Sequence, residues 1–319
     1  MNLATSYLGL PLHSPFVVGA SPFCDDVSVA RKLQDGGAAA VTMRSLFEEQ
    51  FGRPLSHSPH AAADYPEFAD YQFGPERYLV QLTQLKRTLS IPVIASLNGT
   101  HPGSWLGFAV RLESAGADAI ELNLYQVITD PAVAADQVEK EMIAAVDALT
   151  GSVHIPIAVK LSPFHPSIPQ LAVALELAGA SGIVLFNRFY QPDVDLEEIT
   201  VQPQLRLSDS DELLLRLRWL AILSPLLRGS LAATGGVHTA ADTVKALLTG
   251  AHAVQLVSVL LKHGPSVIST LRHGLEKWME GHTFSAIEQF RGRLNLERCP
   301  DAAAFERANY IRVLQSRKV

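Results

Sequence analysis

Ala178-Gly179-Ala180-Ser181-Gly182-Ile183-Val184 is one of four similar junctions along the chain. In each junction glycine closes a helix-like stretch, two or three turn residues follow, and a short apolar strand begins. A junction that recurs in this way predicts alternating βα units and a parallel sheet. The other three junctions are Asp35-Gly36-Gly37-Ala38-Ala39-Ala40-Val41, Ala115-Gly116-Ala117-Asp118-Ala119-Ile120-Glu121 and Thr249-Gly250-Ala251-His252-Ala253-Val254-Gln255.

Further short apolar runs bring the number of predicted strands to eight. Most of them are continuously apolar, as expected of strands buried on both faces, and amphipathic stretches lie between them. Eight βα units predict a single (β/α)₈ barrel, whereas the alternative, a doubly wound open sheet, usually has fewer strands. The predicted strands are Phe16–Ala20, Ala40–Arg44, Val93–Leu97, Ala119–Leu124, Ile157–Leu161, Gly182–Phe186, Leu231–Thr234 and Ala253–Leu256.

Two connections are too long for simple loops and are predicted to be insertions. Residues 46–75 follow the second strand, and residues 187–229 follow the sixth and contain a predicted hairpin and a helix around Glu212–Leu223. Both insertions leave the carboxyl end of a strand, which is the face on which barrels build active sites. We expect one domain over residues 1–319, with a helical tail from about residue 283.

The composition excludes several classes of protein. Hydrophobic residues make up 48% of the 319 residues, which is enough for a large core, and the net charge of −6 without a basic block argues against nucleic-acid and membrane partners. There is no run of 18 apolar residues, and the N-terminus lacks the features of a secretion signal. Cys24 and Cys299 are too far apart for a metal or redox motif, and no dinucleotide or P-loop fingerprint is present. We therefore expect a cytoplasmic protein with a small-molecule substrate and no metal site.

Polar residues stand at the carboxyl ends of the predicted strands, which converge on one pocket in a barrel. Amides, a lysine and an arginine together suit a flat, acceptor-rich, anionic ligand. The glycine pair after strand 7 and the serine after strand 8 belong to loops that commonly bind phosphate in barrels. These residues are Ser21, Arg44, Ser45, Asn98, Asn123, Lys160, Asn187, Gly235, Gly236 and Ser258.

Lys160 interrupts an otherwise apolar strand, so its side chain is predicted to be buried and paired. Two kinds of chemistry would use it. The amine could form a Schiff base in a lyase that acts on a sugar phosphate, or it could offer positive charge to a cofactor.

The chain resembles the dihydroorotate dehydrogenase family, and most closely its shorter cytosolic class. The resemblance implies a (β/α)₈ barrel with FMN at the carboxyl ends of the strands, a homodimer, and oxidation of a CH–CH bond of dihydroorotate or a related dihydropyrimidine. Either fumarate or NAD would accept the electrons, and the NAD route would need a separate electron-transfer partner, because this chain lacks cluster cysteines. The matching pieces are Gly19-Ala20-Ser21-Pro22, Arg44-Ser45, Glu121-Leu122-Asn123, Val159-Lys160-Leu161-Ser162-Pro163, Asn187 and Thr234-Gly235-Gly236-Val237.

The resemblance also implies roles for individual residues. Ala20, Ser21, Ser45, Asn123 and Lys160 would lie at the flavin ring, with Lys160 near N1 and O2, and Gly235, Gly236 and Ser258 would hold the phosphate. Arg44 would also lie at the flavin, where the family has a lysine. Asn123 and Asn187 would bind the pyrimidine. From their places at the strand ends, and not from the resemblance, Arg44, Asn98 and Arg188 are also predicted to bind the substrate, with Arg188 meeting a carboxylate. Residues 187–200 are predicted to form a wall or lid of the site.

The chain departs from the family where the proton-transfer group is expected. The family places a Cys or Ser just after the strand 4 asparagine, but here the run is Asn123-Leu124-Tyr125-Gln126-Val127. His101 and Tyr125 are the candidate replacements, and histidine has the ordinary pKa closer to neutrality. The sequence therefore predicts weak turnover of dihydroorotate with FMN still bound. The alternatives are an FMN-binding relative with another substrate or little turnover and, more distantly, the Lys160 lyase.

Overall fold

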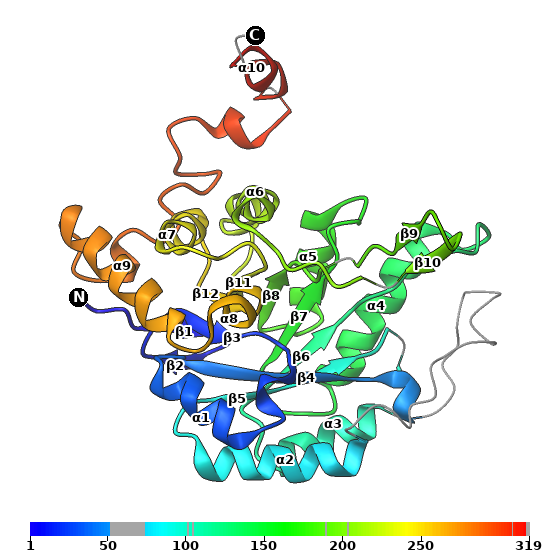
Figure 1. Ribbon diagram of the computed structural model, residues 1–319. Helices are drawn as coiled ribbons and strands as arrows, with labels where there is room; N and C mark the ends of the chain where they lie inside the picture. The colour runs from blue at the N-terminus through cyan, green and yellow to red at the C-terminus, as the bar shows by residue number, and fades with distance from the viewer. Residues whose placement is uncertain are drawn as a thin grey trace.

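The structure is a computed structural model that describes residues 1–51, 74–100, 102–103, 105–188, 190–202, 204–307 and 309–316. Eight parallel strands form a closed barrel in the order β3-β4-β5-β6-β7-β8-β11-β12 (Figure 1). The prediction of a (β/α)₈ barrel is therefore confirmed. The barrel strands are β3 (Phe16–Val18), β4 (Ala40–Phe47), β5 (Val93–Asn98), β6 (Ala119–Asn123), β7 (Ile157–Leu161), β8 (Gly182–Leu185), β11 (Ser230–Thr234) and β12 (Ala253–Leu256).

Helices surround this barrel and connect its strands (Figure 1). The predicted junctions form as expected, since Gly37, Gly116, Gly179 and Gly250 all have a positive φ between a helix and the next strand. The helices are α1 (Val27–Asp35), α2 (Pro75–Thr88), α3 (Trp105–Ser114), α4 (Ala135–Thr150), α5 (Ile168–Leu177), α6 (Leu213–Leu223), α7 (Ala240–Thr249), α8 (Ser258–His263), α9 (Val267–Gly281) and α10 (Asn309–Ser316), with short 3₁₀ turns η1 (Pro22–Cys24), η2 (Glu48–Phe51), η4 (Ser210–Glu212), η5 (Ile287–Gln289) and η6 (Ala302–Phe305).

An N-terminal hairpin closes one end of the barrel. Strands β1 (Thr5–Tyr7) and β2 (Leu10–Leu12) pair antiparallel, and Tyr7, Leu8 and Leu12 pack against small residues at the starts of the barrel strands. These small residues leave the room that the hairpin fills, and the Leu8 amide donates to Ser230 Oγ at 2.9 Å. Among the described residues, the hairpin thus covers the amino ends of the strands and leaves their carboxyl ends uncovered by it.

The insertion after β8 contains the predicted hairpin and helix. Strands β9 (Asp193–Asp195) and β10 (Thr200–Gln202) pair antiparallel and extend away from the barrel, and α6 follows (Figure 1). After β4, which runs three residues past its predicted end at Arg44, the structure describes only η2 of the other insertion. Residues 52–73 lie outside the described part of the chain.

The tail begins on the barrel and then leaves it. The amides of Gly292 and Leu296 donate to carbonyls of Leu247 and Ala221, and Ile287 and Phe290 are fully buried. Helix α10 lies apart from the barrel (Figure 1). That the whole chain behaves as one domain stays a prediction. Within the described residues, no helix is long and apolar enough to cross a membrane.

Candidate active site

Two adjoining cavities lie at the carboxyl ends of the barrel strands. The larger has a volume of about 410 Å³ and the smaller about 190 Å³, and residues of β7, of the β3–α1 loop and of the segment after β8 line both of them. The shared lining makes one elongated site. Ala20, Ser21, Lys160 and Asn187 line both cavities; Arg44, Ser45, Asn98, Asn123 and Tyr125 line the larger; Arg188, Gly235, Gly236 and Ser258 line the smaller.

Every predicted site residue in the described part of the chain therefore reaches one of the two cavities. His101, the other candidate for proton transfer, lies outside the described residues. The register of the parallel strands explains the clustering, since Asn98 pairs with Asn123 across β5 and β6, and Asn123 with Lys160 across β6 and β7. The structure thus brings the predicted residues together, and their roles stay predictions.

Lys160 belongs to a buried polar chain in the centre of the barrel. Its Nζ lies 2.5 Å from Glu121 Oε1, and Glu121 Oε2 accepts a hydrogen bond from Gln255 Nε2, also at 2.5 Å. Glu121 and Gln255 are at most 1% exposed, and Tyr7 lies beside them. Burial raises the pKa of the Tyr7 phenol well above 10, and the nearby Glu121 carboxylate raises it further. The Lys160 amine is thus engaged by Glu121, whereas Schiff-base chemistry requires an amine that is free to attack a carbonyl carbon.

Asn123 offers the clearest sign of a ligand in the larger cavity. The residue is 8% exposed, and its Oδ1 is buried without a hydrogen-bond partner in the described part of the chain. A buried polar atom without a partner is costly, so a ligand that donates a hydrogen bond would stabilise this site. The imide and ring N–H groups of a pyrimidine are donors of this kind.

Arg44 and Arg188 each pair with a carboxylate that the sequence did not indicate. Arg44 makes a two-pronged ion pair with Asp25, in which Nε to Oδ1 is 3.0 Å, so part of its charge is already neutralised within the protein. Burial raises the Asp25 pKa, and Arg44 opposes that rise.

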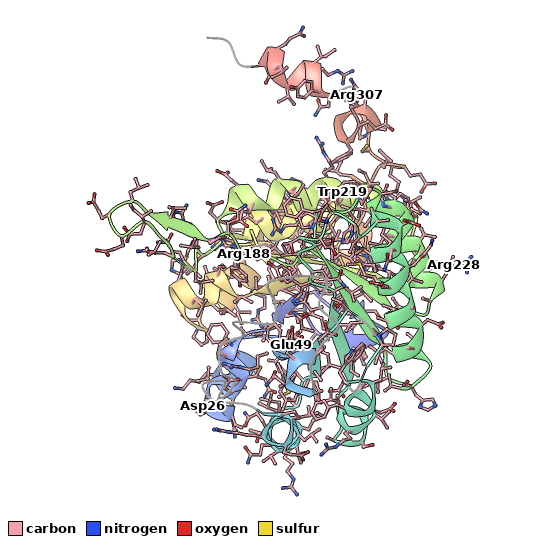
Figure 2. The ribbon with its side chains drawn as sticks, turned by 90° about the vertical axis from the view of Figure 1, so that its right-hand side faces the viewer. Asp26, Glu49, Arg188, Trp219, Arg228 and Arg307 are labelled. Carbon is pink, nitrogen blue, oxygen red and sulfur yellow. The ribbon has the colours of Figure 1, made fainter. Side chains whose placement is uncertain are left out.

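Arg188 lines the smaller cavity, not the one that holds Asn98 and Asn123, and its Nη2 lies 3.2 Å from Glu212 Oε1. Figure 2 shows Arg188 where the chain leaves the barrel for the β9–β10 hairpin.

Tyr125 is half-buried in the larger cavity, and burial raises the pKa of its phenol, with Tyr190 adding to the effect. A phenol with a raised pKa stays protonated at neutral pH, so little phenolate is present to accept a proton. Tyr125 is therefore a poor base in this environment.

The smaller cavity contains a glycine cradle. Gly235 and Gly236 have φ of +79° and +85°, and a Cβ on Gly236 would lie 2.5 Å from the Leu213 amide nitrogen, so both the backbone conformation and the packing of α6 require glycine. Ser208 lies against this cradle, where its Oγ accepts from the Gly236 amide at 3.3 Å and its own amide donates to Ser258 Oγ at 3.1 Å. Backbone amides and hydroxyls around an open space are the groups that bind phosphate.

Four polar residues in or beside this site were not predicted as site residues from the sequence: Glu121, Ser208, Arg216 and Gln255. Glu121 and Gln255 each place a polar side chain in an otherwise apolar strand, and Arg216 interrupts an apolar run in α6. The same argument that selected Lys160 applies to all three of these positions. Ser208 had no comparable signal.

The fold and site define a barrel enzyme whose cavity lies at the carboxyl ends of the strands, with a buried cation and a glycine cradle. The family model described as dihydroorotate dehydrogenase matches residues 2–279. The chain belongs to the dihydroorotate dehydrogenase family, a family of oxidoreductases that act on CH–CH groups and use a flavin cofactor.

Individual relatives are similar over nearly the whole chain. A protein of Aeropyrum pernix with the provisional name dihydroorotate dehydrogenase A (fumarate) is 29% identical over 91% of this chain and 97% of its own. The catalytic subunit of dihydroorotate dehydrogenase B (NAD(+)) from Thermoplasma volcanium is 25% identical over 91% and 98%. The chloroplastic dihydropyrimidine dehydrogenase (NADP(+)) of Arabidopsis thaliana is 23% identical over 91% of this chain and 76% of its own.

Proposed function

We propose that this protein is an FMN-dependent enzyme that oxidises the CH–CH bond of dihydroorotate or a related dihydropyrimidine. The observation that carries the proposal is the pair of adjoining cavities that share Lys160 and Asn187, one with a glycine cradle and the other with amide side chains. A mononucleotide that spans them would place its phosphate at Gly235 and Gly236 and its ring beside Lys160. There is no dinucleotide fingerprint to hold a second nucleotide, which favours FMN over FAD.

The protein's own groups fit this ligand. Lys160, which pairs with Glu121, would lie beside the flavin ring, and Ser45, paired with Ser96 Oγ at 2.7 Å, lines the same cavity. When bound, the flavin supplies the hydride acceptor. The amides of Asn98, Asn123 and Asn187 would orient a flat heterocyclic substrate against the flavin ring. Oxidation of a CH–CH bond removes a hydride and a proton, so one of the protein's side chains must accept the proton.

A second candidate is a substrate other than dihydroorotate, and Tyr125 favours it. This phenol stands where the resemblance expects a Cys or Ser, and its raised pKa leaves little phenolate at neutral pH to accept a proton. Dihydroorotate would then be oxidised slowly, while another small cyclic compound reduces the flavin efficiently. The names of the relatives leave both possibilities open, since they include dihydroorotate and dihydropyrimidine dehydrogenases.

The electron acceptor, assembly and location extend the proposal. Relatives named for fumarate and for NAD(+) are similarly related to this chain, so we propose either acceptor, the latter through a separate electron-transfer partner. A homodimer and a cytoplasmic location complete the proposal, the first on the family resemblance and the second on composition.

The flavin that the protein carries tests the cofactor part. The purified protein is denatured, and the released flavin is separated by chromatography against FMN, FAD and riboflavin standards. FMN is the expected product. Recovery of FAD, or of no flavin from a protein that also fails to bind added FMN, would contradict the proposal.

A further inference from the structure

Arg216 is a buried guanidinium that faces the smaller cavity. Its side chain is 6% exposed, its Nε donates to the Thr234 carbonyl at 2.7 Å, and its Nη1 donates to the Glu212 carbonyl at 2.6 Å. These two bonds fix the plane of the guanidinium. The remaining nitrogen, Nη2, lies at the glycine cradle, because a Cβ on Gly235 would be only 2.8 Å from it. Because glycine has no side chain, Gly235 leaves the Nη2 edge of the Arg216 guanidinium open to the cavity.

The positive charge of Arg216 is only partly balanced by the protein. Its ion pair is with Glu212, at 3.7 Å, and the same carboxylate lies closer to Arg188, at 3.2 Å. Lys262 adds a further positive charge nearby, where its Nζ donates to the Ser208 carbonyl at 2.8 Å. The Asp242 carboxylate is occupied by the Ser210 hydroxyl and by backbone amides at the start of α7.

A buried cation with so little compensation is costly unless an anion accompanies it. Burial lowers the pKa of Arg216, with Glu212 opposing the shift, which is the signature of a charge that has lost more hydration than it has regained. An anion between Nη2, the amides of the cradle and Ser258 would supply the missing partner. A phosphate monoester has the charge and the acceptor oxygens for this position.

We propose that Arg216 binds the phosphate of the flavin and thereby sets the preference of this protein for FMN over riboflavin. This inference rests on the proposed function, because it takes FMN as the ligand. It adds a charged group directly beside the glycine cradle, at a position where the sequence alone predicts only an apolar helix.

Binding of FMN and riboflavin to flavin-free protein tests the proposal, because the two ligands differ only in the phosphate. Wild type, Arg216→Gln, Arg216→Lys and the control Arg218→Gln are titrated by flavin fluorescence. Arg218 lies on the same helix but is exposed. Loss of a charge-assisted hydrogen bond in Arg216→Gln should weaken FMN binding by about 10- to 100-fold, while riboflavin binding changes by less than about threefold.

The two other variants are expected to differ from Arg216→Gln. Arg218→Gln should leave both affinities unchanged. Arg216→Lys keeps the charge but loses the planar set of N–H donors that the guanidinium presents. The ammonium should stay near the Thr234 carbonyl and reach the phosphate less well, so FMN affinity should fall by about 3- to 10-fold relative to riboflavin.

Equal losses for FMN and riboflavin in Arg216→Gln would show that Arg216 only supports the fold, and the proposal would be overturned while the flavin function stands. If Arg216→Gln does not fold, as judged by circular dichroism, Arg216→Lys decides, and an unchanged ratio of the two affinities overturns the proposal. Wild-type protein that binds neither ligand would refute the proposed function itself and this inference with it.

Discussion

Replacement of Lys160 by methionine should destabilise the flavin-free protein strongly, because it breaks a buried ion pair from one side. Glu121 is completely buried, and Lys160 Nζ lies 2.5 Å from it. Methionine preserves most of the side-chain volume, so the loss reports on charge and not on packing. Among the described residues, the Glu121 carboxylate would then keep the Gln255 amide as its one hydrogen-bond donor. Leaving a buried charge without its counter-charge costs about 3–5 kcal/mol.

Urea unfolding followed by circular dichroism at pH 7 measures this loss. The matched control is Lys140→Met, since Lys140 pairs with Asp136 on the exposed face of α4 and exposed pairs of this kind contribute little. The control should be indistinguishable from wild type. The double variant Lys160→Met, Glu121→Gln removes both charges and should recover most of the lost stability, because replacing both partners of a buried pair costs far less than removing one.

The reasoning would be refuted if Lys160→Met cost less than about 1 kcal/mol, the range of an exposed pair. It would also be refuted if the double variant were no more stable than the single one. Either result would mean that the buried Glu121 carboxylate does not depend on Lys160 as its partner.

Three further predictions concern pH, proton transfer and the wall of the site. Burial lowers the pKa of His252 to about 4, and its Nδ1 accepts from the Leu231 amide, so the native state needs the neutral ring. Because the pKa of His252 in the folded state lies below the ordinary value of about 6.5, the stability that the neutral ring contributes is present above pH 6.5 and is lost as pH falls towards 4, by about 3 kcal/mol in all. His252→Gln should therefore flatten the pH dependence of the free energy of unfolding measured in urea, and substitution of the exposed His154 by Gln should not. Tyr125→Phe should slow flavin reduction by a similar factor across pH 5–9, because a phenol with a raised pKa stays protonated throughout this range. Fast reduction by dihydroorotate that is untouched by Tyr125→Phe and His101→Asn would refute both candidates for proton transfer and the expected slow turnover. Glu197 and Glu198, between β9 and β10, should be cleaved by a glutamyl endopeptidase more slowly when flavin and orotate are bound, and equal rates would argue against residues 187–200 as a lid.

The sequence was sufficient for the barrel because each strand carries its own signal. Continuous apolar runs and glycine-closed helices are local features, and they placed all eight strands. The polar residues at strand ends followed from them, since the barrel topology brings those ends together whatever the side chains are.

The residues that the sequence did not reveal depend on packing between distant segments. A strand buried on both faces does not show which side chains point into the barrel, so the pairing of Glu121 with Lys160 and Gln255 could not be read from β6, β7 and β12 separately. Likewise, the sequence shows Arg216 in a leucine-rich helix but does not show that α6 packs against the end of β11, which is what brings Arg216 to the site. These contacts join segments up to 134 residues apart, as in the hydrogen bond between Gln255 and Glu121.

The central claim is that this protein passes electrons from a dihydropyrimidine to a bound flavin. Anaerobic stopped-flow mixing of the flavin-loaded protein with dihydroorotate, dihydrouracil, dihydrothymine and unrelated cyclic reductants tests it most directly, with loss of the visible flavin absorbance as the readout. At least one dihydropyrimidine should reduce the flavin rapidly, with dihydroorotate slower than expected for its family. A loaded protein whose flavin is reduced by none of the dihydropyrimidines would contradict the claim.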